Sequence, residues 1–311
     1  MSAPTQVIQR RDLSDLVKEF NTQDNMAGFV GLGIMPKVDV VNPDGNYPVI
    51  NKEALTQDAD VKRSNRGAYN RVDFGFEQAN FSLEEYGLEI PVDDALAKNY
   101  DSYFRAEAEA QDIVLDILAK KQEVRIRDIV EGQNANAVGT SWSTSATATP
   151  RADVLAGQKA VRDLIGTIPT KMTMTWDKFQ EILITAEFMD SAKYTSNVLA
   201  LGLDAQISLV KSYLGLSSLN LSYGVLNTAD EGQDFSGAGI WDDTKAFLQV
   251  EPAATIAGGP NFGHTLNWAA DEVVNTESYE EPQTRSNILR TRHWRSEKVK
   301  LAEAGYLLSN L

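Results

Sequence analysis

The sequence contains no cysteine and only two histidines, His264 and His293. Without cysteine the chain cannot form a disulfide, a thiolate zinc site, an iron–sulfur cluster or a cysteine nucleophile. Two histidines leave almost no material for a multi-histidine metal site or for Ser/His/Asp catalysis. These absences disfavour an enzyme, and we expect no catalytic residue, no metal ligand and no cofactor.

Long apolar runs are also missing. The longest near-apolar stretch, residues 29–36, includes two glycines and falls far short of the about 18 residues that a membrane span requires. At the N-terminus, charged residues follow only two apolar ones, so the apolar core of a secretory signal is absent. We therefore expect a protein that is neither exported nor inserted in a membrane.

Positive charge is scarce: 29 Lys and Arg stand against 44 Asp and Glu, and the formal net charge is −15. This negative net charge argues against a protein whose main task is to bind nucleic-acid phosphates. The length of 311 residues and the 42% hydrophobic content are typical of a globular protein with about two domain-sized units. Lone Gly-x-Gly pairs at 31–33 and 237–239 do not make a phosphate loop, and adjacent acids such as Asp242 and Asp243 are interpreted as solvated surface groups.

The N-terminal third has few residues that can form a core. Apolar spacing predicts a short helix over residues 12–22, and a turn near 42–45 separates the extended segments that follow it. This stretch looks too thin to bury itself and is expected to be an arm. Alternation of period two predicts strands at 72–76 and 88–92, and the polar residues 54–70 predict a protruding hairpin tip.

The centre alternates between helix and strand, which is typical of an α+β fold. A long helix is predicted over 102–131, followed by a loop over 133–149. Shorter helices are predicted at 153–164, after Thr175 and at 204–214, with strands at 171–174 and 216–226. The apolar face expected for the long helix consists of Ala106, Ala110, Ile113, Val114, Ile117, Leu118 and Val124.

The last sixty residues predict a long hairpin. Extended runs at 262–276 and 286–301 flank a turn at 280–283. Residues 271–281 are acidic and residues 285–300 basic, so we expect opposite charges to attract across a strand pair or between copies. Because His293 and Trp294 stand among the arginines, nucleic-acid contact is the less favoured alternative.

Several segments, and their order, resemble the major capsid proteins of tailed phages, whose fold is shared with encapsulins. The resemblance rests on residues 225–243 (VLNTADEGQDFSGAGIWDD), the following apolar run from Phe247 to Pro252, the aromatic strand 262–268, the basic strand 285–300 and the ending 304–311. It covers nearly the whole chain. It implies residues 1–44 as N-terminal arm, 45–92 as extended loop, 93–159 as peripheral domain with a spine helix, 160–258 as axial domain, and 259–311 as peripheral hairpin and C-terminal strand.

The resemblance also implies a function. We expect a structural protein that assembles through pentamers and hexamers into an icosahedral head, encloses double-stranded DNA with weak contact, and works with a scaffolding protein, a portal and a possible decoration protein. Its place is the virion capsid, built in the host cytoplasm. An encapsulin-like nanocompartment and a monomeric carboxylate-dependent hydrolase are the alternatives. The expected assembly contacts are Leu13, Leu16, Phe20, Lys62, Arg63, Arg66, Glu280, Glu281, Arg285, Arg290, Arg292 and Arg295.

Overall fold

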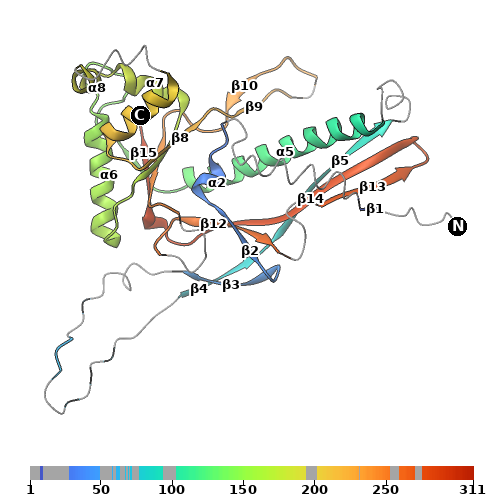
Figure 1. Cartoon of the computed structure of the whole chain (residues 1–311), viewed down its shortest axis with the longest axis horizontal. Coiled ribbons are helices and arrows are strands. Elements are labelled where there is room, and N and C mark those ends of the chain that lie inside the picture. Colours follow the sequence, from blue (N-terminus) through green and yellow to red (C-terminus); the bar gives the residue numbers. More distant parts are fainter. Residues whose placement is uncertain are drawn as a thin grey trace.

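The computed structural model is elongated, with a helical lobe at one end and a long sheet with one parallel helix extending from it (Figure 1). It describes residues 8–9, 28–49, 58, 61–63, 67, 69, 71, 77–93, 103–193, 202–230, 232–252, 259–269 and 275–311. The mixture of helices and sheets confirms the α+β prediction. Within these ranges no helix is both long enough and apolar enough to cross a membrane.

The extended part is a six-stranded sheet organised around its longest strand, β14 (Ser286–Val299). This strand pairs antiparallel with β13 (Asn275–Glu281), β5 (Glu84–Asp93) and β12 (Gly263–Trp268). The outer strands are β1 (Ile8–Gln9), beside β13, and β2 (Lys37–Val40), beside β12. The predicted hairpin with its turn near 280–283 is confirmed, and β5 confirms the strand predicted at 88–92.

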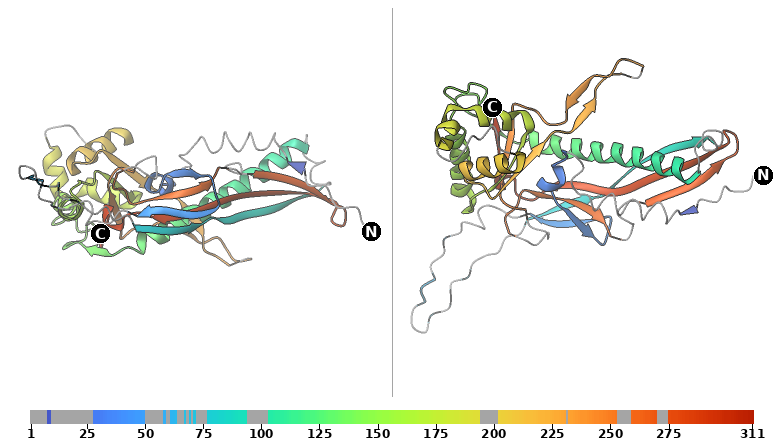
Figure 2. Two further views of the ribbon diagram at one scale, coloured as in Figure 1. Left: turned by 90° about the horizontal axis from the view of Figure 1, so that it is seen from below. Right: turned by 45° about the horizontal axis from the view of Figure 1, so that its top comes forward.

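Helix α5 (Tyr103–Glu131) lies along this sheet (Figure 2). Its length agrees with the prediction, but its expected apolar face is partly wrong: Ile113 is 54% and Ile117 39% exposed, whereas Gln111 is fully buried. The sheet beneath presents polar side chains, so the helix packs there by hydrogen bonds. Gln111 donates to Thr276 (Nε2 to Oγ1, 2.9 Å) and accepts from Thr291 (Oγ1 to Oε1, 3.1 Å).

The helical lobe covers a second, five-stranded sheet with the order β6-β15-β11-β7-β8. Its core is apolar and includes Trp142, Phe179, Phe188 and Leu248. The predicted helices and the strand at 171–174 are confirmed, and the loop predicted over 133–149 contains one short strand, β6. The bounds are β6 (Ala135–Ala137), α6 (Pro150–Ile165), β7 (Lys171–Thr175), α7 (Trp176–Ile184), α8 (Ala186–Ala192), α9 (Leu203–Leu214), β8 (Ser218–Ser222), β11 (Ala246–Gln249), a 3-10 turn (Ala302–Ala304) and β15 (Gly305–Ser309).

The N-terminal stretch from residue 28 to residue 40 is part of the core. It forms the short helix α2 (Gly31–Ile34) and then β2, and Ile34 and Met35 are completely buried. The expectation that this stretch is too thin to bury itself is wrong for these residues, because β2 pairs in parallel with β12 and α2 packs on α5. The helix predicted at 12–22 lies outside the described residues.

Two hairpins leave the body of the subunit. Strands β3 (Asp44–Val49) and β4 (Glu77–Ser82) pair antiparallel and form the base of the hairpin expected in this region. The strand predicted at 72–76 and most of the predicted tip lie outside the described residues. The second hairpin joins β9 (Val225–Asn227) to β10 (Gly237–Gly239) and projects beyond the helical lobe (Figure 2).

Candidate assembly surfaces

The basic strand β14 forms ion pairs within its own subunit. In the strand register Arg290 lies opposite Glu277 of β13 and Glu89 of β5, and its guanidinium is 2.5 Å from the Glu89 carboxylate. Arg292 Nη1 lies 3.0 Å from Glu85 Oε1, and Arg292 Nη2 lies 3.2 Å from Glu277 Oε1. The predicted attraction between the basic strand and an acidic strand is therefore confirmed. It involves three strands, because β14 pairs with acidic side chains of both β13 and β5.

Three of the expected assembly residues are consequently engaged inside the subunit. Arg290 and Arg292 are held by the carboxylates just described, and their side chains are 40% and 26% exposed. Arg295 is only 4% exposed and donates a hydrogen bond to Gln122 of α5. Since a buried guanidinium cannot reach a second copy, Arg295 serves the packing of α5 on β14.

Of the candidates at the far end of the sheet, Glu280 and Arg285 are exposed and Glu281 is half-buried. Glu280, Glu281 and Arg285 surround the β13–β14 turn at the far end of the sheet (Figure 1). Glu281 accepts a hydrogen bond from Thr284 (Oγ1 to Oε2, 2.7 Å), and Arg285 has the positive φ of 50° that a tight turn requires. This end therefore presents charged side chains on a fixed turn.

The loop between β3 and β4 carries two further candidates. Lys62 and Arg63 are exposed, and the Arg63 guanidinium lies 4.5 Å from the centre of the Tyr69 ring. This cation–π contact fixes the arginine locally. Four candidates, namely Leu13, Leu16, Phe20 and Arg66, lie outside the described residues.

A buried carboxylate that sequence reasoning missed connects three parts of the subunit. Glu123 of α5 is 3% exposed and accepts hydrogen bonds from the backbone of Val30 (2.8 Å) and Gly31 (2.9 and 3.0 Å) and from the Trp241 indole (2.7 Å). Burial raises its pKa, and the three donors oppose that shift. The only sequence signal was its position on the buried side of α5, between Leu118 and Val130.

Another buried titratable group is His293, in the centre of β14. Burial, together with the positive charges of Arg295, Arg125 and Lys37, lowers its pKa to about 2. Its ring lies 5.9 Å from the Tyr86 ring. The imidazole is therefore neutral and acts as a packing group, so it does not complete a basic surface for nucleic acid.

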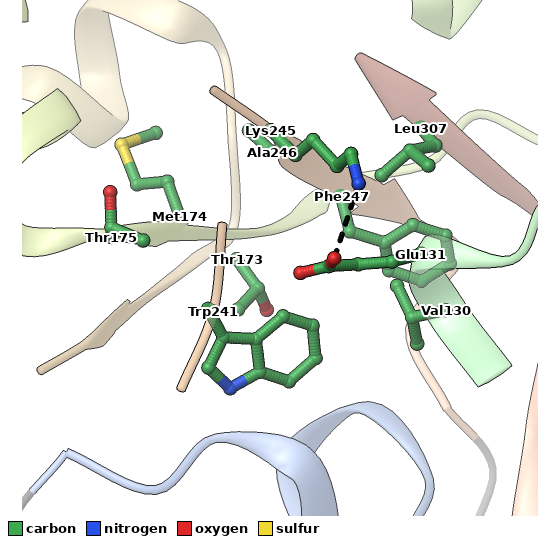
Figure 3. A pocket seen from close by; sticks show the side chains of 10 residues that line it. All are labelled: Val130, Glu131, Thr173, Met174, Thr175, Trp241, Lys245, Ala246, Phe247 and Leu307. Atoms are coloured by element: carbon green, nitrogen blue, oxygen red, sulfur yellow. Dashed lines mark hydrogen bonds and ion pairs between the residues drawn. The ribbon is translucent and has the colours of Figure 1, made fainter. Parts of the chain in front are cut away.

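A small pocket lies between α5 and the five-stranded sheet (Figure 3). The Lys245–Glu131 ion pair, at 3.2 Å, stands at its wall. The cavity volume is about 10 Å³, which is room for about one water molecule. The buried hydroxyls of Thr173 and Thr175, which line it, make no hydrogen bond to the described part of the protein. The cavity thus fits an internal water and no substrate.

Acidic and histidine side chains do not gather in a metal site. Across the described ranges, no group of three or more has the placement to hold a metal ion. The adjacent acids Asp242 and Asp243 start a turn in which Asp242 accepts from Thr244 and pairs with Lys245 at 3.1 Å. These contacts lower the pKa of Asp242 despite its partial burial.

Comparison with known proteins gives the fold a class. The fold is shared with a phage-related protein from Bordetella bronchiseptica (TM-score 0.72, 18% identity, 98% of each chain covered). It is also shared with the putative capsid protein of an Escherichia coli prophage (TM-score 0.57, 10% identity, 98% and 100% covered). The chain therefore has the capsid fold of tailed phages.

No protein-family model matches the chain. Sequence comparison points to a particular kind of phage protein. The chain is 24% identical over 303 residues to the major capsid protein of Burkholderia phage BcepMu, with 92% of both chains covered. The resemblance to phage major capsid proteins inferred from segment order is thus confirmed over nearly the whole length.

Proposed function

We propose that this chain is the major capsid protein of a tailed phage, of which many copies form an icosahedral shell around double-stranded DNA. The observation that carries the proposal is the match to a phage major capsid protein over 92% of both chains. The fold agrees with it, because 98% of the chain superposes on a phage-related protein. In this proposal the protein is structural and catalyses no reaction.

The domain division is part of the proposal. The β3–β4 hairpin supports an extended loop over 45–92, helix α5 supports the spine helix of a peripheral domain over 93–159, and the helical lobe supports an axial domain over 160–258. Residues 259–311 supply the peripheral hairpin and the C-terminal strand. Because residues 28–40 belong to the core, we place the free part of the arm, proposed over 1–44, before Gly28.

The partners follow from charge and architecture. With a net charge of −15, an inner wall repels the phosphate backbone, so packaged DNA is held with weak contact and slides during filling. Pentamers and hexamers of this chain, a scaffolding protein, a portal and a possible decoration protein complete the head. The shell is assembled in the host cytoplasm and becomes the capsid of the virion.

Two other functions give different results in the same experiments. An encapsulin-like nanocompartment is the alternative shell function, and the fold is also that of a virus-like particle from Pyrococcus furiosus (TM-score 0.54, 11% identity, 96% and 98% covered). A carboxylate-dependent hydrolase has less support, because Glu85, Glu89 and Asp242 are engaged in ion pairs with neighbouring cations.

Electron microscopy with light scattering tests the proposal directly. The purified chain is examined alone and after co-expression with its neighbouring genes. We expect closed shells or rings of five and six subunits, and DNA-filled heads in the complete system. Particles that contain only a protein cargo would favour the nanocompartment, and a monodisperse monomer under every condition would contradict both shell functions.

A further inference from the structure

A groove of about 700 Å³ runs along the outer edge of the five-stranded sheet. Strand β8 forms this edge and, among the described strands, pairs only with β7. One wall is the segment 28–33, and the other carries Trp176, Ile207, Leu219 and Leu221. An unpaired strand edge beside apolar side chains is a template for another chain, and this volume is in the range of ligand-sized pockets. The groove is therefore suited to a few inserted side chains.

The β9–β10 hairpin has the opposite character, because it projects and has little to pack against. Its strands have three residues each, none of them buried. Two-stranded hairpins of this kind are marginally stable alone. Near the tip, Phe235 is 75% exposed, and a Cβ atom on Gly237 would lie 3.0 Å from its ring. The glycine thus lets the ring lie against the hairpin backbone, where it faces solvent as an exposed aromatic anchor.

Hydrogen bonds close the base of the loop that joins the two strands. The Thr228 amide donates to the Ser236 carbonyl at 2.8 Å, and the Asn227 side-chain oxygen accepts from the amides of Ala229 and Ser236 at 3.1 Å. A preorganised loop loses less conformational freedom when it binds. The hairpin is built as a stiff finger rather than as a loose connection.

We propose that the β9–β10 hairpin of one copy inserts Phe235 into the β8 groove of a neighbouring copy. The hairpin starts beside the groove but points away from α9 (Figures 1 and 2), so a subunit does not fill its own groove. Asp230 and Asp234 flank the aromatic side chain, and Lys171 lines the groove 3.7 Å from Glu251. Burying one phenylalanine removes about 150–250 Å² from water.

Such a contact joins different surfaces of two identical chains. Contacts of this head-to-tail kind close into rings when the rotation per subunit allows it. The inference rests on the proposed shell function, since it needs many copies held together, and it adds the surfaces by which neighbours in one ring recognise each other.

Cysteine crosslinking tests the contact without background, because the chain has no cysteine of its own. Asp234→Cys, at the exposed position next to Phe235 that leaves the aromatic side chain in place, and Leu203→Cys, on the 44% exposed start of α9 beside the groove, are treated with a short bismaleimide. When the two single variants are mixed, we expect a crosslinked dimer that contains one of each. The double variant is expected to give a ladder up to five or six subunits. Val41→Cys, at an 80% exposed position, replaces Asp234→Cys as the matched control and is expected to give no dimer with Leu203→Cys.

Light scattering on the same samples separates the two hypotheses. Crosslinks together with shells support both the contact and the capsid function. Shells without crosslinks overturn the contact and leave the capsid function standing, whereas crosslinked chains without shells support the contact and contradict the function. Neither crosslinks nor shells overturns both. In a second measurement Phe235→Ser is expected to lower shell yield at least tenfold with unchanged melting temperature, and Phe235→Trp to retain it; equal yields for both variants would overturn the contact.

Discussion

Glu123 gives the sharpest test of how the subunit is held together. In Glu123→Ala the amides of Val30 and Gly31 and the Trp241 indole lose their acceptor. Each buried donor left without a partner costs about 1–3 kcal/mol, and water entering the small space left behind recovers part of that. We expect a loss of about 3–5 kcal/mol in the free energy of unfolding, typical of breaking a buried polar cluster, and a melting temperature lower by on the order of 10 °C.

Glu123→Gln separates hydrogen bonding from charge. The amide oxygen can take the place of Oε1, which accepts from all three donors, and the buried negative charge disappears. Because burial raises the pKa of this carboxyl, removing the charge also removes a desolvation penalty. We therefore expect Glu123→Gln to stay within about 1.5 kcal/mol of the parent.

Circular dichroism melts and urea titrations followed by tryptophan fluorescence measure both variants. The matched control is Glu109→Ala, which removes an exposed carboxylate from the same helix. If Glu123→Ala unfolds with the same midpoint as Glu109→Ala, the hydrogen bonds from Glu123 to the start of α2 and to Trp241 do not stabilise the subunit.

Three other changes probe the packing, the titration and the charged surfaces. Gly305→Ala places a Cβ against the Phe247 ring without room for it, so overpacking should destabilise the subunit by about 1–3 kcal/mol. Gly259→Ala, with open space around it, should not shift the melting temperature. Burial and the nearby positive charges lower the pKa of His293 to about 2 in the fold, against 6.5 for an ordinary histidine. The unfolded chain binds the extra proton, so the free energy of unfolding should fall by about 2 kcal/mol from pH 7 to pH 5, and His293→Gln should remove that part of the slope. Arg290→Glu should lower the melting temperature of the subunit, because position 290 faces Glu89 and Glu277. Arg285→Glu, at the exposed turn, should leave the melting temperature unchanged and reduce shell formation measured by sedimentation. The opposite pattern would contradict the assignment of Arg290 to the fold and of Arg285 to assembly.

Local sequence patterns predict most of the helices and strands, but they do not predict polar contacts between residues far apart in the sequence. The span of α5 follows from its composition and from Gly132 after its end, but its buried face depends on the polar side chains of β14, which lie far away in the sequence. With an apolar partner sheet Ile113 and Ile117 would be the buried residues. Because Gln111 finds two threonine partners, it is buried instead.

The ion pairs of β14 with its neighbouring strands also depend on residues that are far apart in the sequence. Segment charges predicted that β14 would attract acidic strands, and Glu277 of β13 is one partner. The register that places Glu85 and Glu89 of β5 on the other side depends on a pairing across about two hundred residues, which no local pattern specifies. The arm was misjudged for the same reason, since β2 is stabilised by parallel pairing with the distant β12.

The subunit separates residues that hold its fold from residues offered to neighbours. Arginines in the middle of β14 are neutralised by two flanking strands, and α5 is tied to the sheet by buried hydrogen bonds. At the extremities the strand pairing is mostly local: among the described strands β3 pairs with β4 and β9 with β10, and the β13–β14 turn ends a hairpin whose strand β14 also pairs with β5. Elements with few buried contacts open at low free energy, so binding to a second copy stabilises them more than it stabilises the core. In a shell built from such subunits, the contacts that complete each extremity are the contacts that join the copies.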